Sequence, residues 1–210
     1  MFRLPMRYLL FISLVLFFYG CSNAYRGMTA VPGNAACLER FKPHFIKTLY
    51  RTRVDLTGNH LSGILLIKLM PDSSTRMVLS NEMGFSYFDF AFAADGSFRV
   101  FYVFPKMDKK AVITTLRKDF ELVLMQHLDS QQPQIRRREG LTYYRFPQAS
   151  GSYYYITTKD CGQLVRVERA GRRKPVVTAV MSGSGQGVPD SIGITHNNFN
   201  FTIGLKKISP

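Results

Sequence analysis

The segment GFSYFDFAFAADGSFRVFYVF, Gly84 to Phe104, constrains the fold most because nine of its residues are aromatic. It is typical of two β-strands joined at Asp95-Gly96. Side chains along a strand alternate between two faces, and a two-residue loop would place Phe90 opposite Phe101. Neither face is then polar, so we expect apolar material on both sides of this hairpin. One face would carry Phe88, Phe90, Phe92, Phe101 and Val103.

The rest of the chain is rich in strands. Alternating apolar runs separated by short turns precede the hairpin, which is typical of an antiparallel meander, and further strands follow residue 140. The polar segment SQQPQIRRREG between them is expected to be exposed. The count is about ten strands in one sheet. Because strand twist accumulates, a sheet of this size curls and acquires a concave face.

One long helix is predicted from Asp108 to Leu128, with Asp108 as its cap. Its apolar residues recur every three or four positions and form a wide stripe that can pack on an apolar sheet. The fold class is therefore α+β, mainly antiparallel β, with a helical cover over one curved sheet. A short helix capped by Asn34 is also expected. The stripe includes Leu116, Phe120 and Val123.

The N-terminus has the features of a signal peptide. Arg3 and Arg7 precede an apolar run from Tyr8 to Tyr19, which is too short to span a bilayer comfortably. The run ends in Gly20-Cys21, which resembles a bacterial lipobox, in which the cysteine thiol receives a diacylglycerol. The alternative is an ordinary secreted protein with an unmodified Cys21.

The expected domains are a signal peptide over 1–20, a lipidated tether over 21–34 and one monomeric domain over 35–210. No aspartate follows Cys21, which favours the outer membrane, facing the periplasm, over retention in the inner membrane. Removing Arg3 and Arg7 with the signal lowers the formal charge from +14 to +12.

Two cysteines and four histidines of the mature chain are candidates for a disulfide or a metal site. Cys37 and Cys161 can form a disulfide in an oxidising periplasm, or remain two free thiols. The histidines are scattered without ligand spacing, so we expect no metal site and no cofactor. The histidines are His44, His60, His127 and His196.

Motifs for enzymatic chemistry are missing from the sequence. It contains no Gly-x-Ser-x-Gly or His-Glu-x-x-His, and SGSGQG at 182–187 is not followed by the Lys-Ser/Thr of a phosphate loop. We therefore expect no enzyme. Basic clusters at 136–138 and 172–174 are typical of phosphate binders, but the periplasmic location argues against nucleic acid. Anionic lipid headgroups or an acidic protein partner are alternatives.

A curved sheet lined by Phe, Leu and Val offers acyl chains an apolar site, each buried methylene contributing roughly 0.8 kcal/mol. We expect this cavity between the Phe-rich hairpin face and the helix. In the alternative, helix and sheet pack together without a cavity, and the protein is a structural or interaction module that uses its basic surface. The predicted lining is Phe88, Phe90, Phe92, Phe101, Val103, Leu116, Phe120 and Val123.

The order of several segments resembles the LolA/LolB-like lipoprotein-localisation family over about residues 41–210. The similarity lies in HLSGILLIK, RMVLSNEMGFSYFDFAF, LRKDFELVL and PDSIGITHNNFNFTIGLKKI. This resemblance implies an open half-barrel with a helical lid and a hydrophobic cavity for lipoprotein acyl chains. It also implies that an anchored member accepts lipoproteins from a periplasmic carrier.

Overall fold

One continuous antiparallel sheet of thirteen strands forms the body of the protein, and it is open, with β1 and β6 at its edges. The computed structural model describes residues 23–129, 132–183 and 187–208. The strand order is β1-β7-β8-β9-β10-β11-β12-β13-β2-β3-β4-β5-β6. The strands are β1 (Thr29–Ala30), β2 (Lys47–Leu56), β3 (Asn59–Leu69), β4 (Thr75–Ser80), β5 (Ser86–Phe92), β6 (Phe98–Val103), β7 (Gln134–Arg138), β8 (Leu141–Pro147), β9 (Ser152–Thr158), β10 (Leu164–Ala170), β11 (Pro175–Ser182), β12 (Ser191–His196) and β13 (Phe201–Lys207).

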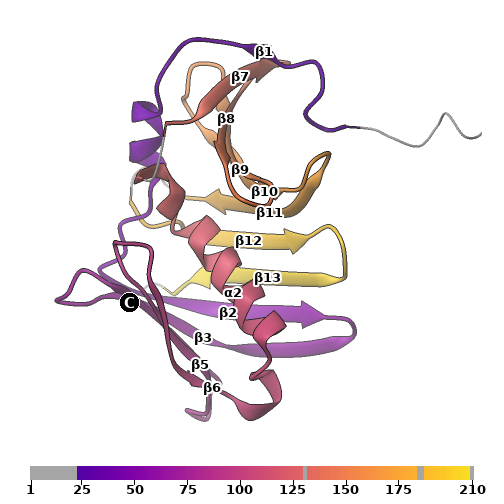
Figure 1. Cartoon of the computed structure of the whole chain (residues 1–210). Coiled ribbons are helices and arrows are strands. Elements are labelled where there is room, and N and C mark those ends of the chain that lie inside the picture. Colours follow the sequence, from indigo (N-terminus) through magenta and orange to yellow (C-terminus); the bar gives the residue numbers. More distant parts are fainter. Residues whose placement is uncertain (1–22, 130–131, 184–186, 209–210) are drawn as a thin grey trace, which may run out of the picture.

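Helix α2 (Lys110–Val123) crosses the concave side of this sheet (Figure 1). Strand twist turns β7 and β8 steeply away from the direction of β11–β13, so the sheet curves around the helix. Short 3-10 helices lie before β2, before α2 and after α2. They are η2 (Ala36–Phe41), η3 (Pro105–Met107) and η4 (Gln126–Asp129).

Alternation along the strands separates the core from the solvent. In β2, Tyr50 and Thr52 are buried, whereas Arg51 and Arg53 between and after them are exposed. The same period of two in the neighbouring strands directs apolar side chains toward α2. A single large core therefore fills the space between the concave face and the helix.

The prediction of about ten strands is corrected to thirteen within the described part of the chain. The residues of β7 were predicted to belong to an exposed polar segment. Only Ile135 of the five is buried, so no apolar alternation marks this strand in the sequence. The predicted closing strand is two strands, β12 and β13, separated by a turn at 197–200. The third addition is β1, whose two residues pair with Arg136 and Arg137 of β7. The antiparallel sheet and its covering helix agree with the sequence prediction.

Between β5 and β6, the Ala93–Ser97 hydrogen bond closes the hairpin around three residues, 94–96, instead of the two predicted. The Ala93 amide donates to the Ser97 carbonyl at 2.9 Å, and Gly96 adopts a φ of 81°, which is typical of a turn followed by a bulge. Phe90 consequently pairs with Val100, and not with Phe101 as predicted. A register shift beyond Phe90 restores the predicted pairing of Phe88 with Val103.

The expectation of apolar cover on both faces of the hairpin is also corrected. Helix α2 covers one face, while Phe101 and Tyr102 on β6 are exposed by 50% and 41%. Arg76 lies over the Phe101 ring at 4.3 Å and donates two hydrogen bonds to Asp89, at 2.8 and 2.6 Å. A charged pair and ring contacts therefore cover part of this face in place of another layer.

The predicted helix boundaries differ from those observed. Helix α2 begins at Lys110 with Lys109 as its N-cap, and no side-chain hydrogen bond from Asp108 caps it. It ends at Val123, and the chain continues through η4 after Met125, which has a φ of 52°. The short helix near residue 36 is 3-10, and Asn34 Oδ1 accepts a hydrogen bond from the Ala36 amide at 3.0 Å.

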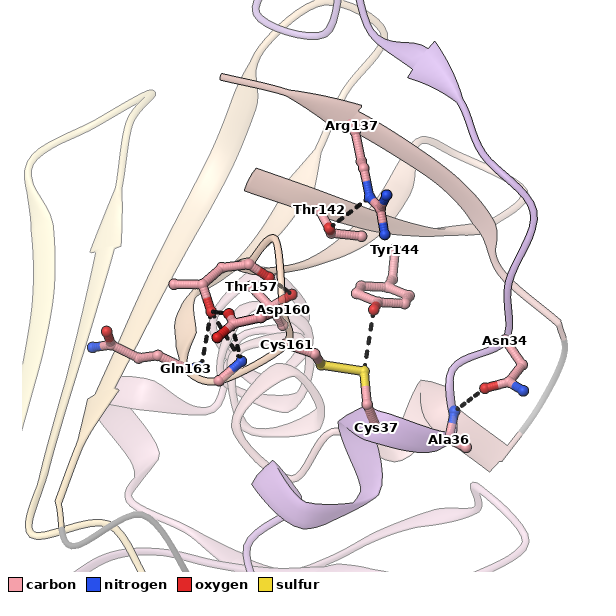
Figure 2. Close-up of a disulfide and its surroundings, with 12 residues drawn as sticks. Asn34, Ala36, Cys37, Arg137, Thr142, Tyr144, Thr157, Asp160, Cys161 and Gln163 are labelled. Atoms are coloured by element: carbon pink, nitrogen blue, oxygen red, sulfur yellow. Dashed lines mark hydrogen bonds between the residues drawn. A yellow bond between two sulfur atoms is a disulfide. The ribbon is translucent and has the colours of Figure 1, made fainter. Parts of the chain in front are cut away.

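A disulfide joins Cys37 in η2 to Cys161 in the β9–β10 turn, across 124 residues of sequence (Figure 2). The Tyr144 hydroxyl lies 3.1 Å from Cys37 Sγ, and Figure 2 shows this contact beside the disulfide. Of the two possibilities left open by the sequence, the structure has the paired cysteines. The bond fastens the segment that leads into β2 to the opposite half of the sheet.

Candidate functional site

Most of the residues predicted to line a cavity meet between α2 and the concave sheet. Phe88 and Phe90 stack with ring centroids 4.5 Å apart, and Phe120 of α2 lies 5.7 Å from Phe88. These rings are at most 2% exposed. The structure therefore brings them into direct contact, with side chains filling the space between them. Phe92, Leu116 and Val123 belong to the same buried cluster, and Val103 packs against it.

Phe101 is the one predicted lining residue that lies elsewhere. The register shift in β6 leaves it on the outer side, where its half-exposed ring lies beneath Arg76. The sequence-based prediction placed Phe101 on the inner face because a two-residue loop was expected at the tip of the hairpin.

An open groove of about 930 Å³ lies at one end of the helix–sheet interface. One wall is the C-terminal part of α2 with η4, and the other comes from the strand ends and turns that surround them. Phe92 is the only predicted lining residue among those that border it. The turns are those of β3–β4, β5–β6 and β8–β9, together with residues 42–46 before β2.

The groove has an apolar floor and an apolar edge. Phe45 and Phe92 are buried on its floor, whereas Ile46 and Leu69 at the edge are 76% and 46% exposed. The Leu69 amide donates to the Ile46 carbonyl at 2.9 Å, which holds these two side chains on adjacent segments. Exposed aliphatic side chains beside a recess are what an amphiphilic ligand can cover.

Basic side chains outnumber acidic ones around the same groove. Arg117 donates to Glu121 at 2.6 Å, so this acid is paired one helical turn from its partner. The lining thus combines apolar surface with net positive charge. Its lysines and arginines are Lys42, Arg117, Lys118 and Arg169, and its acids are Asp95 and Glu121.

The aromatic pair at the inner end of the groove is uncharged near neutral pH. His127 of η4 stacks on Tyr153 of β9 with centroids 3.9 Å apart. Burial lowers the pKa of His127, although Glu121 opposes this effect. Burial also raises the pKa of Tyr153 to about 12, so both rings present neutral surfaces to the groove.

A buried polar cluster fastens α2 to the sheet. His196 Nε2, in β12, lies 2.7 Å from Asp119 Oδ2, and Arg169 of β10 lies 3.8 Å from the other carboxylate oxygen. The Asp119 side chain is fully buried. Burial raises the pKa of Asp119, while the hydrogen bond from His196 lowers it. The helix is therefore held to β12 by a hydrogen bond and to β10 by an ion pair, as well as by apolar packing.

Sequence reasoning missed Asp119 and the charged part of the groove. Asp119 lies three residues after Leu116 and beside Phe120, so it occupies the apolar stripe of the helix. A carboxylate at such a position signals a buried partner. The partner His196 is distant in sequence, and the fold alone identifies it.

Cys21, the predicted lipid attachment residue, lies outside the described residues, as does the predicted signal peptide. No helix in the described ranges is long and apolar enough to cross a membrane. Among the described side chains, no three His, Cys, Asp or Glu are grouped so as to hold a metal ion.

A LolA superfamily protein from Nitrosomonas europaea aligns with 85% of this chain and 93% of its own, at a TM-score of 0.53 and 9% identity. This chain has the LolA-like fold. At such low identity the similarity establishes the fold alone.

Two other solved structures align with this chain at lower scores. A DUF1329 family protein from Desulfovibrio piger covers 82% of this chain and 88% of its own, with 10% identity and a TM-score of 0.43. An outer membrane lipoprotein-sorting protein domain from Vibrio parahaemolyticus covers 84% and 90%, with 6% identity and a TM-score of 0.45. No protein-family model and no curated protein matches the sequence.

Proposed function

We propose that this protein is a lipoprotein, anchored through Cys21 to the outer membrane and facing the periplasm, that binds acyl chains of lipids or of other lipoproteins. The groove beside α2 and η4 carries this proposal. Its volume of about 930 Å³ lies toward the upper end of the roughly 300–1,000 Å³ typical of small-molecule sites. The LolA-like fold supports a role in lipoprotein localisation, with a periplasmic carrier as the partner that delivers cargo.

The groove suits an amphiphile because its two surfaces differ. The buried floor around Phe45 and Phe92 and the exposed edge at Ile46 and Leu69 would contact methylenes, each contributing roughly 0.8 kcal/mol on burial. Polar groups of the ligand would remain near the charged side chains of the helix. No covalent step is needed, and cargo would move toward whichever site holds it better.

Entry deeper into the interface would require α2 to move. Phe88, Phe90 and Phe120 fill that region, so an acyl chain longer than the groove would displace ring contacts. An acid placed at Phe90 would lie in this fully buried stack and would destabilise the fold. Variants at the groove edge therefore test binding more cleanly.

The test replaces both edge residues by glutamate, Ile46→Glu with Leu69→Glu. We expect binding of a fluorescent acyl probe with a neutral headgroup to weaken at least tenfold. Each lost aliphatic contact removes up to about 1.5–3 kcal/mol of apolar burial. Fluorescence titration of wild type and variant measures the change.

The matched control is Ile64→Glu with Val100→Glu. Ile64 and Val100 are 37% and 40% exposed and lie outside the groove lining. The two glutamates therefore add the same charge at a distance from the groove. The control should bind as wild type does. Equal loss in both double variants, or a wild type that does not bind the probe, would contradict the groove assignment.

The closed aromatic core favours a second candidate, a non-catalytic structural or interaction module that docks an envelope partner through its basic surface. Such docking should weaken steeply as salt rises, because screening shortens the range of exposed charges to about 8 Å at physiological ionic strength. Binding of a neutral acyl probe in the groove should be nearly independent of salt.

A further inference from the structure

The first described residues, Ala24 and Tyr25 among them, pack against the outer face of the sheet. The Tyr25 ring stacks on Tyr154 at 4.2 Å, and its hydroxyl donates to Glu168 Oε2 at 2.6 Å. The Ala24 amide donates to the Arg173 carbonyl at 2.8 Å, and Arg138 donates back to the Ala24 carbonyl at 2.8 Å. The start of the domain therefore has a defined position beside the β10–β11 turn (Figure 1).

This position limits where an anchor at Cys21 can lie. Cys21 precedes Asn23 by two residues, and a chain spans at most about 3.6 Å per residue, so the two Cα atoms are within about 7 Å of each other. A lipid on Cys21 would thus hold the β10–β11 turn close to the bilayer surface.

That turn belongs to a rim formed by three adjacent turns. The Asn197 amide of the β12–β13 turn donates to the Val176 carbonyl of β11 at 2.9 Å. The Thr57 amide of the β2–β3 turn donates to the Asn200 carbonyl at 3.0 Å. Figure 1 shows these turns along the edge of the sheet from which the N-terminal segment departs.

The rim combines positive charge with exposed apolar side chains. Arg172, Arg173 and Lys174 are exposed in the β10–β11 turn. Phe199 in the next turn is 46% exposed, and Leu56 before the third is 41% exposed. Basic residues attract anionic headgroups, and exposed Phe and Leu side chains can insert at the boundary between headgroups and acyl chains.

We propose that this rim, made of residues 56–58, 172–174 and 197–199, is a docking surface for an anionic phospholipid bilayer. The proposal rests on the lipid anchor at Cys21 included in the proposed function. It adds an orientation of the domain on the membrane. The anchor and the rim contact the bilayer together, whereas the outer face of β6 does not contact it.

Tryptophan fluorescence tests the orientation, because the chain contains no native tryptophan. Phe199→Trp reports on the rim in the lipidated full chain reconstituted into vesicles containing phosphatidylglycerol. Phe101→Trp is the control, since its ring is similarly exposed and β6 lies five strand spacings from β13, about 24 Å along the sheet. We expect a blue shift and quenching by brominated lipid for position 199 alone. Equal responses, a response only at position 101, or none at either position would overturn the proposal.

A charge test separates the rim from the anchor and from the groove. In the chain carrying Cys21→Ser, reversal of Arg172, Arg173 and Lys174 to glutamate should reduce partitioning onto phosphatidylglycerol vesicles at least tenfold. Reversal of Arg51, Arg53 and Lys206, which are exposed on the middle strands, should reduce it less than threefold. Equal losses, or no vesicle binding before reversal, would overturn the proposal.

Acyl-probe binding is measured on the same variants. Retained probe binding with lost vesicle binding assigns the effect to the rim. If the protein binds vesicles through the rim but does not bind the probe, acyl binding in the groove is contradicted and the proposed docking surface still stands.

Discussion

Replacing Asp119 by alanine is expected to lower the free energy of unfolding by about 3–5 kcal/mol, because it removes the hydrogen-bond partner of buried His196 and the carboxylate that pairs with Arg169. The Asp119 and His196 side chains are at most 1% exposed, so water cannot replace the lost carboxylate without rearrangement. Urea unfolding followed by circular dichroism measures the change.

Glu121→Ala provides the comparison on the same helix. It removes an ion pair one turn apart, whose arginine side chain is 41% exposed, and we expect a loss of about 0.5 kcal/mol. If the two variants lose similar stability, the buried cluster does not fasten α2 as described.

Opening the Cys37–Cys161 disulfide is expected to lower the free energy of unfolding by about 4–5 kcal/mol. The bond closes a loop of 124 residues, and the chain-entropy estimate for a loop of that size is about 5 kcal/mol. Urea unfolding of the Cys37→Ser/Cys161→Ser variant, compared with wild type, measures this cost.

Reduction of the wild-type protein is the matched control. Cys161 has a φ of 56°, a backbone conformation that serine would also have to adopt, so the two experiments should agree. Reductant should leave the double variant unchanged. A loss below 1 kcal/mol in both would show that the cross-link does not restrain the unfolded chain.

Local patterns predicted the parts of the fold that depend on neighbouring residues. Alternation placed Phe88, Phe90 and Phe92 on one face, and all three are buried there. The stripe on the helix correctly identified Leu116 and Phe120 as buried. The hairpin register was wrong near its tip because one loop residue changes which side chains share a face.

Elements made by distant contacts could not be predicted in the same way. β7 has a single buried residue, Ile135, and its sequence is as polar as an exposed loop. The docked N-terminal segment depends on Tyr25 meeting Tyr154 and Glu168, far along the chain. The groove likewise requires turns from separate hairpins to converge beside η4.

Native mass spectrometry of the chain carrying Cys21→Ser, exported to the periplasm and purified without detergent, tests acyl binding most directly. The proposal predicts a co-purified acylated molecule that is depleted in Ile46→Glu/Leu69→Glu and retained in Ile64→Glu/Val100→Glu. Ligand-free masses for all three proteins, with no uptake of an added acyl probe, would contradict it.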